Sequence, residues 1–398
     1  MLELLLPMMF GLLLGVVCGL IPGLHPNNMI VFVPLLLSFF DPLSASVILV
    51  SAGIVNCFVA MIPSILLGAP EDAEALGVLP GHRLLLEGRG YEAIKLTVTG
   101  GLGGMTFALL SLPLFMVVIP PLYEFIKPVT HWLLILVVGY MIFIEKGWKN
   151  RGAALAIVLL SGFLGIFSLE YSDSMIFPLL SSLFGLPLLL TSIFEKTTLP
   201  DKFTEDEDKI ENKKLLRSIG AGSVAGIITG LLPGVGGSQA TILAQKLAGS
   251  DGEGRDFLLS ISAVNIANVI YSFLALWLID RARSGIAVAV GEMIQIDFEY
   301  VMIFLAVIVV SSAIASVLTL KLTKPTLYVL RRINYSAVNI GTIVLMAGMI
   351  LFFTGPMGLF VASIGIAIGL IPNYIDVKRT HCMGCLVLPI IIYYASAA

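Results

Sequence analysis

Charged side chains are scarce in this sequence. Only 12% of its 398 residues are Asp, Glu, Lys or Arg, whereas 58% are hydrophobic, and the mean hydropathy is +1.01. A soluble core of this size cannot bury so much apolar surface. The chain also lacks the basic tract that is typical of a nucleic-acid-binding protein. The composition therefore predicts an all-α polytopic membrane protein.

Cysteine and histidine are also rare, with four of each, and they are widely scattered. So few cysteines exclude a disulfide framework. Cys382 and Cys385 have a CxxC spacing, but no further thiol or histidine cluster completes a zinc site. No nucleophile with a neighbouring base is evident in the apolar runs. We therefore expect neither an enzyme nor a bound metal or cofactor.

Apolar runs of about 15 to 25 residues, the length of a membrane span, occur seven times in each half of the chain. The first run lacks a basic region before it, so we interpret it as a retained span. One long polar stretch, EKTTLPDKFTEDEDKIENKKLLR, covers residues 195–217. We predict a first membrane repeat over 1–195, a polar cytoplasmic linker over 196–214 and a second membrane repeat over 215–398.

The two halves contain the same phrase. GLLLGVVCGLIPG (11–23) and GSVAGIITGLLPG (222–234) lie 211 positions apart. At this offset Ser51-Ala52 matches Ser262-Ala263, and Asn56 falls within one residue of Asn268. At an offset of 202, GLPLLL (185–190) matches VLPIII (387–392). The chain is therefore predicted to consist of two related halves.

The basic residues predict that these halves have inverted topology. With the N-terminus outside, seven crossings per half place all 23 basic residues except Lys127, Arg281 and Arg283 inside, as the positive-inside rule requires. The basic loop EKGWKNR (145–151) corresponds to TGPMG (354–358), which has no basic residue. We expect both termini to be non-cytoplasmic in the cell membrane. The inversion survives if runs 1 and 2, or 8 and 9, form re-entrant hairpins, so the number of full crossings stays open.

The repeated phrase suggests two physical roles. Glycine at every fourth position leaves one helix face without side chains, which lets another helix approach closely. The prolines and glycines that follow, Pro22-Gly23 and Pro233-Gly234, should interrupt their helices. Irregular backbone is tolerated in a bilayer only where it is buried in protein or lines a wet cavity. Two inverted repeats with helices broken at Pro-Gly motifs are a hallmark of secondary transporters.

Polar residues follow each predicted break and suggest a binding site for an anion. A helix N-terminus offers free N–H groups and a partial positive charge. No acidic residue lies between Leu4 and Phe40 or between Leu215 and Ser250 to compete with an anion. The predicted substrate-binding residues are Pro22, Gly23, His25, Asn27, Asn28, Asn56, Pro233, Gly234, Gly236, Gly237, Ser238, Gln239, Thr241, Asn265 and Asn268. The alternative is a pair of packing kinks, with His25 and the three span asparagines in structural hydrogen bonds.

The stretch EDAEALGVLPGHRLLLEGRGYEAIK (71–95) is too charged to span a membrane. We interpret it as an interfacial helix and turn whose charges are solvated at the membrane surface. The alternative assigns Pro80-Gly81-His82-Arg83 to a cytoplasmic gate.

The two Pro-Gly breaks, the stretch IPSILLGAPEDAEALGVLPGHRLLLEGRGYEA (62–93) and the C-terminal GLIPNYIDVKRTHCMGCLVLPI (369–390) resemble the large membrane subunit of tripartite tricarboxylate transporters, the TctA family. The resemblance implies a permease for carboxylates such as citrate. It also implies an extracytoplasmic binding protein, a small membrane subunit, and sodium or a proton as coupling cation. PGVGGSQAT also resembles the PG-x-GG-T phrase of the polyprenyl-phosphate transporter family, so a lipid-linked phosphate translocase is the alternative function.

Overall fold

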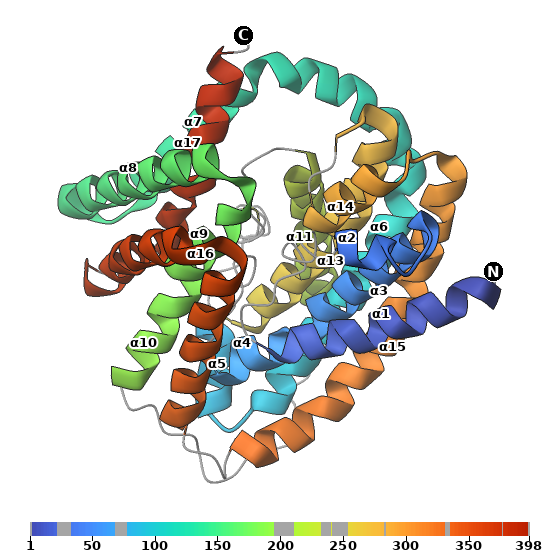
Figure 1. Ribbon diagram of the computed structural model, residues 1–398, viewed down its shortest axis with the longest axis horizontal. Coiled ribbons are helices and arrows are strands. Elements are labelled where there is room, and N and C mark those ends of the chain that lie inside the picture. Colours follow the sequence, from blue (N-terminus) through green and yellow to red (C-terminus); the bar gives the residue numbers. More distant parts are fainter. Residues whose placement is uncertain are drawn as a thin grey trace. The chain divides into compact units, whose positions relative to one another are not determined.

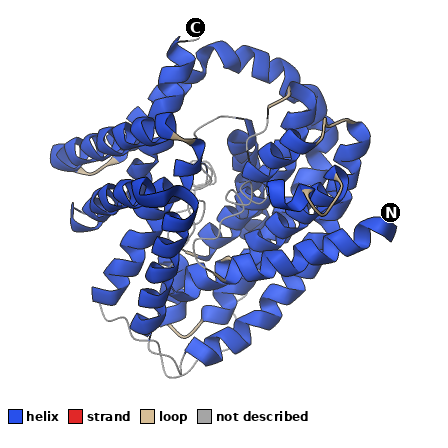
Figure 2. Ribbon diagram, in the orientation of Figure 1, coloured by secondary structure: helices blue, strands red, loops and turns tan. Residues whose placement is uncertain are grey.

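A computed structural model of the chain describes residues 2–21, 33–67, 78–194, 211–231, 240, 254–281, 284–330, 335–375 and 377–396. Over these ranges the chain forms helices joined by short turns, without a strand (Figure 2). Six of the described helices are long and apolar enough to cross a membrane. The prediction of an all-α chain with several membrane spans is therefore confirmed for this part of the molecule.

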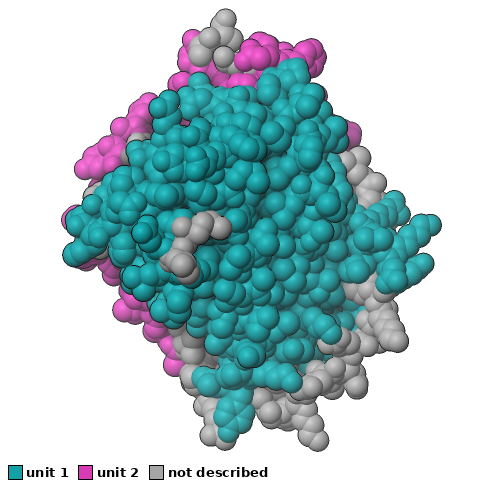
Figure 3. Space-filling model, turned by 90° about the vertical axis from the view of Figure 1, so that its right-hand side faces the viewer, with its two compact units in different colours: residues 1–121, 198–231, 237–335 teal, residues 122–197, 232–236, 336–398 magenta. Residues whose placement is uncertain are grey.

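Two compact units divide the chain, and Figure 3 colours them separately. Unit 1 comprises residues 1–121, 198–231 and 237–335, and unit 2 comprises residues 122–197, 232–236 and 336–398. The breaks after residues 121 and 335 lie 214 positions apart, close to the sequence offset of 211. Each unit therefore takes corresponding segments from both predicted halves. The predicted domains, 1–195 and 215–398, are defined by matching sequence in the two halves, and they stay a prediction.

Unit 1 contains the glycine-rich helix of each repeated phrase (Figure 1). Its elements are η1 (Leu2–Leu4), α1 (Leu5–Leu20), α2 (Val33–Leu37), α3 (Pro42–Val59), α4 (Met61–Leu67), α5 (Val78–Leu86), α6 (Gly90–Ile126, up to residue 121), α11 (Asn212–Leu231), α13 (Arg255–Ile279), α14 (Gly285–Met293) and α15 (Phe298–Leu330).

Helices α3 and α13 form the interior of unit 1. In the most apolar window of each of these two spans, 94% of the residues are buried, compared with 17% for α6. Asp41 caps α3, because its Oδ1 accepts hydrogen bonds from the backbone N–H groups of Leu43 and Ser44, both at 3.1 Å. Hydrogen bonds from the side chain and backbone of Ser44 hold the pKa of Asp41 below its usual value. The interior helices thus carry most of the apolar burial in this unit.

The repeated glycines pack α1 against α3 and α11 against α13 in the same register. A Cβ added to Gly15 would lie 2.5 Å from the carbonyl oxygen of Ala52 and 2.7 Å from Val55 Cβ. At Gly226 it would lie 3.1 Å from the carbonyl oxygen of Val264 and 2.7 Å from Ala267 Cβ. The contacted residues of the two pairs lie 212 positions apart. The predicted packing role of these glycines is confirmed, because only a bare helix face permits this approach.

The next layer of unit 1 joins the two halves. Helix α6, from the first half, packs on α13 through Gly100 and Gly104, where an added Cβ would meet the backbone of Leu259 and Ala263. Helix α15, from the second half, packs on α3. The outer helix of each half therefore contacts the interior helix of the other half.

Unit 2 contains the last part of each half. Its elements are η4 (Lys127–Val129), α7 (Thr130–Ile144), α8 (Gly147–Tyr171), η5 (Asp173–Met175), α9 (Ile176–Leu180), the π-helical turn η6 (Ser181–Gly185), α10 (Leu186–Phe194), α16 (Tyr335–Ile375, from residue 336), η7 (Arg379–Met383) and α17 (Gly384–Ser396).

In unit 2, as in unit 1, elements of one half pack on elements of the other half. Helix α8 packs on α17, where an added Cβ at Gly384 would lie 2.7 Å from Ser161 Oγ. Helix α16 packs on η6, where an added Cβ at Gly365 would contact Ser182 Oγ. Residues 161 and 365 lie 204 positions apart, and residues 182 and 384 lie 202 apart. The same junction is thus built twice, with glycine and serine exchanged.

Two turns with left-handed glycines also correspond. Gly147 (φ +83°) begins α8 after the turn from α7, and Gly355 (φ +67°) interrupts α16 just before Pro356. A positive φ disfavours residues with a Cβ, so glycine is favoured at both points. The α7–α8 turn and the kink in α16 are therefore counterparts.

Candidate functional site

Most of the predicted substrate-binding residues lie outside the described residues. These are Pro22, Gly23, His25, Asn27 and Asn28 after the first repeated phrase, and Pro233, Gly234, Gly236, Gly237, Ser238, Gln239 and Thr241 after the second. The described helices lead up to both segments at equivalent points. Helix α1 ends at Leu20 and α11 at Leu231, each two residues before the proline. The Pro-Gly breaks themselves stay predictions.

The remaining predicted residues, Asn56, Asn265 and Asn268, lie on the two interior helices of unit 1. The side chains of Asn56 on α3 and Asn265 on α13 are buried, and that of Asn268 is half-buried. Asn268 Oδ1 accepts a hydrogen bond from Ser272 Oγ, one turn along α13, at 3.4 Å. Helices α3 and α13 contact each other. The structure thus places all three amides in the enclosed part of one unit.

Buried hydroxyls in unit 1 were missed by the sequence analysis. Ser311, Ser312 and Thr319 on α15 are fully buried, as Ser262 on α13 nearly is. Their hydroxyl oxygens have no hydrogen-bond partner among the described residues. An unpaired buried hydroxyl is costly and needs an explanation. The signal was present in VIVVSSAIASVLTL (307–320), where four hydroxyl side chains interrupt an apolar run.

A buried ion-pair cluster lies at the beginnings of α6 and α13. The Glu92 side chain is 5% exposed, with Arg89 Nε 2.7 Å from Oε2 and Arg255 Nε 2.9 Å from Oε1. For Glu92 this finding corrects our expectation that the charges of residues 71–95 are solvated; Glu71, Asp72 and Glu74 lie outside the described residues. Among these charges Arg83 and Glu87 do form an exposed pair, at 3.7 Å. Glu92 is buried where α6 meets α13, a helix of the second half, which supplies Arg255 as a second cation.

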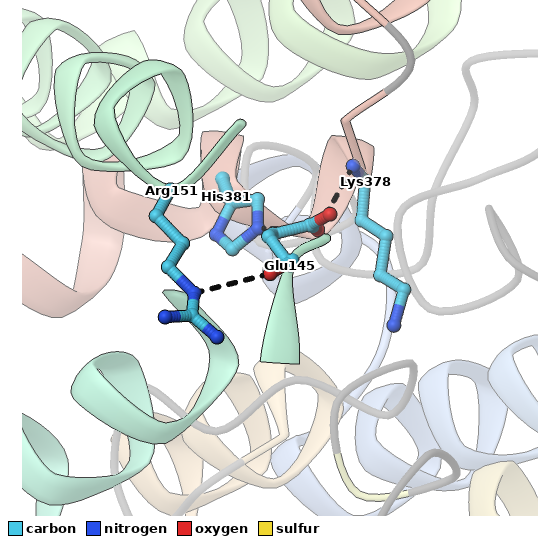
Figure 4. A network of polar contacts seen from close by, with 4 residues as sticks. All are labelled: Glu145, Arg151, Lys378 and His381. Carbon is cyan, nitrogen blue, oxygen red and sulfur yellow. Dashed lines mark hydrogen bonds and ion pairs between the residues drawn. The ribbon is translucent and has the colours of Figure 1, made fainter. Parts of the chain in front are cut away.

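Unit 2 holds a second buried polar cluster, which Figure 4 shows. Glu145, in the turn between α7 and α8, is 7% exposed, and its Oε1 lies 3.0 Å from Nε2 of His381 on η7. The same oxygen accepts a hydrogen bond from the backbone N–H of Lys378 at 3.3 Å. Nothing in the sequence pointed to this pair, because its members lie 236 positions apart.

The surroundings of this pair set its protonation. Burial lowers the pKa of the His381 imidazole below its usual value, and the hydrogen bond and charge of Glu145 partly oppose that shift. Arg151 does not neutralise the carboxylate, because its Nε donates to the backbone carbonyl of Glu145, at 3.1 Å. The Arg151 guanidinium instead lies over the rings of Phe143 and Trp148. The pair is therefore a buried carboxylate beside an imidazole that favours its neutral form.

Long apolar helices, two compact units and polar groups enclosed between helices define a multi-pass membrane protein. Residues 5–384 match the tripartite tricarboxylate transporter TctA family, and the chain belongs to this family. TctA is a family of transporters and not of enzymes. The chain is also similar to an uncharacterized protein of Methanocaldococcus jannaschii, with 29% identity over 404 residues and 98% of each chain covered. No solved structure was found to match the chain.

Proposed function

We propose that this chain is the permease subunit that moves an organic anion, a di- or tricarboxylate, across the cytoplasmic membrane by alternating access. The observation that carries the proposal is the pair of glycine-packed helices, α1 and α11. They pack on corresponding residues of α3 and α13 and end at equivalent points before Pro-Gly. In many transporters, paired helix breaks from two repeats form the substrate site.

The residues that follow these helices favour an anionic substrate. Both segments are free of acidic residues and rich in amide, hydroxyl and glycine groups. Backbone and side-chain N–H groups at a helix N-terminus suit a carboxylate. The amides of Asn56, Asn265 and Asn268 on the interior helices of unit 1 are further hydrogen-bonding groups. We propose that these groups together bind the substrate.

The exchange of partners between the halves supports their inverted relation. Helix α6 packs on α13 while α15 packs on α3, and α8 packs on α17 while α16 packs on η6. A two-fold axis generates such reciprocal contacts, because residue i of one half meets residue j of the other and the converse. Together with the swap of basic loops, these contacts favour a pseudo-two-fold axis in the membrane plane.

Accessibility from the two sides of the membrane tests the inversion. We expect cysteines introduced as Lys149→Cys and Pro356→Cys, which lie in the counterpart turns, to react with a membrane-impermeant thiol reagent from opposite sides. We choose Pro356 and not its neighbour Gly355 as the second position, because the positive φ of that glycine disfavours a side chain. The natural cysteines are buried or half-buried, so the unmodified protein is a suitable background control. Reaction of both variants from the same side would contradict the inversion.

Thermal unfolding of the purified protein tests the substrate class. Citrate and related di- and tricarboxylates should raise the midpoint of unfolding, because a ligand at 100 times its Kd stabilises the folded state by about 2.7 kcal/mol. A monocarboxylate of equal ionic strength is the matched control. Stabilisation by a polyprenyl phosphate but by none of these acids would favour the lipid-linked phosphate translocase instead.

We further propose two protein partners. The family is that of tripartite tricarboxylate transporters, so an extracytoplasmic binding protein and a small membrane subunit would complete the system. Co-purification of these two proteins with the full chain is the direct test of the assembly.

A further inference from the structure

The Glu145–His381 pair is buried in unit 2, where it joins the turn between α7 and α8 to η7. A buried ionisable pair loses hydration that its mutual attraction does not always restore. The repeated architecture supplies an internal comparison, because the kink in α16 is the counterpart of the turn that carries Glu145. If the pair served only to join these elements, the counterpart would be expected to carry a similar one.

An aromatic pair lies close to that counterpart position. Phe353 precedes the left-handed Gly355 by two residues, just as Glu145 precedes Gly147. Its ring contacts Phe177 on α9, with ring centroids 6.3 Å apart and planes at 83°. At the offset of 202 His381 corresponds to residue 179, and Phe177 lies two residues from it. One junction between the halves thus contains the contact of Phe353 with Phe177, and the corresponding junction contains Glu145 and His381.

We propose that Glu145 and His381 form a proton-binding site through which a proton gradient drives transport. The inference rests on the proposed permease function and assigns its coupling cation. With Glu145 ionised and the imidazole neutral, Nε2–H of His381 donates to Oε1, and Nδ1 is the acceptor for an incoming proton. Binding one proton takes the pair from one negative charge to neutral. The proton comes from the outer solution and leaves to the cytoplasm, so no other reactant is needed.

The groups around the pair favour a proton over sodium. Glu145 Oε1 already faces two N–H donors, the His381 ring and the Lys378 backbone, which a metal cation would have to displace. The elements packed against the pair are α7, α8, η6, η7 and α17. Their titratable or charged side chains, with the flanking positions, are His131, Tyr140, Lys146, Lys149, Arg151, Glu170, Tyr171, Lys378, Arg379, Cys382, Cys385, Tyr393 and Tyr394. Besides burial, the positive charge of Lys378 among them lowers the pKa of His381, which favours release of the proton.

Titration of the histidine rings tests proton binding without any substrate. The chain has four histidines, so selective isotope labelling gives four ring signals, and the signal lost in His381→Asn assigns His381. We expect His381 to take up a proton only below the usual pKa of an imidazole, because burial disfavours its charged form. Glu145→Gln should lower its midpoint by about one pH unit or more, because a neighbouring opposite charge is removed. A His381 ring that binds no proton down to pH 4, or a midpoint unchanged by Glu145→Gln, would overturn the proposal.

Transport measurements test the coupling. In proteoliposomes containing the full chain and the subunits that co-purify with it, an inward proton gradient should stimulate citrate uptake. With a gradient of one pH unit, the stimulation of uptake should be about tenfold in the wild-type protein and absent in Glu145→Gln. Glu145→Gln should retain citrate–citrate exchange at equal pH. Glu170→Gln, at an exposed position on α8, is the matched control and should behave like the wild-type protein.

A double variant distinguishes a structural role of the pair from a role in proton coupling. Glu145→Phe with His381→Phe copies the aromatic counterpart, so we expect it to fold, to exchange citrate and to ignore the proton gradient. Stimulation that persists in Glu145→Gln or in the double variant contradicts the coupling role. Wild-type uptake that does not respond to the gradient also contradicts it. Absence of any carboxylate movement by the wild-type protein would instead count against the proposed function, and the histidine titration then still decides whether the site binds a proton.

Discussion

Gly15→Leu and Gly226→Leu should each lower the stability of the purified protein by more than about 3 kcal/mol, a large part of the roughly 5 to 15 kcal/mol that holds a domain folded. The added Cβ at Gly15 already lies 2.5 Å from a backbone oxygen of α3. At Gly226 it lies 2.7 Å from Ala267 Cβ on α13. A leucine can be accommodated only if the two helices separate. Thermal unfolding and size-exclusion chromatography in detergent measure the effect.

A smaller substitution at the same position should cause a smaller loss of stability. Gly226→Ala should cost about 1 to 3 kcal/mol, the usual range for overpacking. The matched control is Gly220 on α11, where an added Cβ has nothing within 4 Å. Gly220→Ala should be neutral or stabilising, because alanine favours a helix by about 0.5 to 1 kcal/mol over glycine. Equal stabilities for Gly226→Leu and Gly220→Leu would rule out the close packing of α11 on α13.

Gly236→Val and Gly237→Val should abolish high-affinity binding of citrate while the protein stays folded. A valine side chain in this segment blocks the approach of the backbone donors that we propose bind the carboxylate groups. Two hydrogen bonds to a charged group, at about 1.5 kcal/mol each, multiply to a loss on the order of 100-fold. Ser238→Ala and Asn27→Ala each remove one such bond and should weaken affinity by roughly tenfold. Isothermal titration of folded variants measures these losses.

The control for these variants is Gly220→Ala, which leaves the proposed site untouched and should bind citrate like the wild-type protein. If all four break variants bind with unchanged affinity, the substrate site lies elsewhere. The repeated phrase would then serve packing alone, as the glycines of α1 and α11 already do.

The membrane class and the glycine packing were predictable from local patterns. Apolar length and the scarcity of charge determine whether a helix is stable in lipid, and both are properties of a short segment. The four-residue spacing of Gly11, Gly15 and Gly19 places them on one face whatever their surroundings. The repetition of that spacing at 222, 226 and 230 predicted a second helix of the same kind, and the structure has both.

The environment of single polar residues was less predictable. Glu92 lies in a charged stretch that resembles a solvated surface segment, yet Arg255 from the other half encloses it. Ser311 and Ser312 read as ordinary residues of an apolar run, yet their hydroxyls are buried without a partner in the described part of the chain. Burial depends on which helix packs on which, and no local pattern specifies that choice.

By itself the sequence determined that the chain is a helical membrane protein, that it repeats a glycine-packed helix before each Pro-Gly, and that it resembles the TctA family. These properties follow from composition, periodicity and matching text. Only the tertiary structure decided that each unit combines corresponding segments of both halves, and that Glu145 meets His381. The physical reason is that such contacts join positions far apart in the sequence, 236 residues in the case of Glu145 and His381, and they result from the packing of many helices at once.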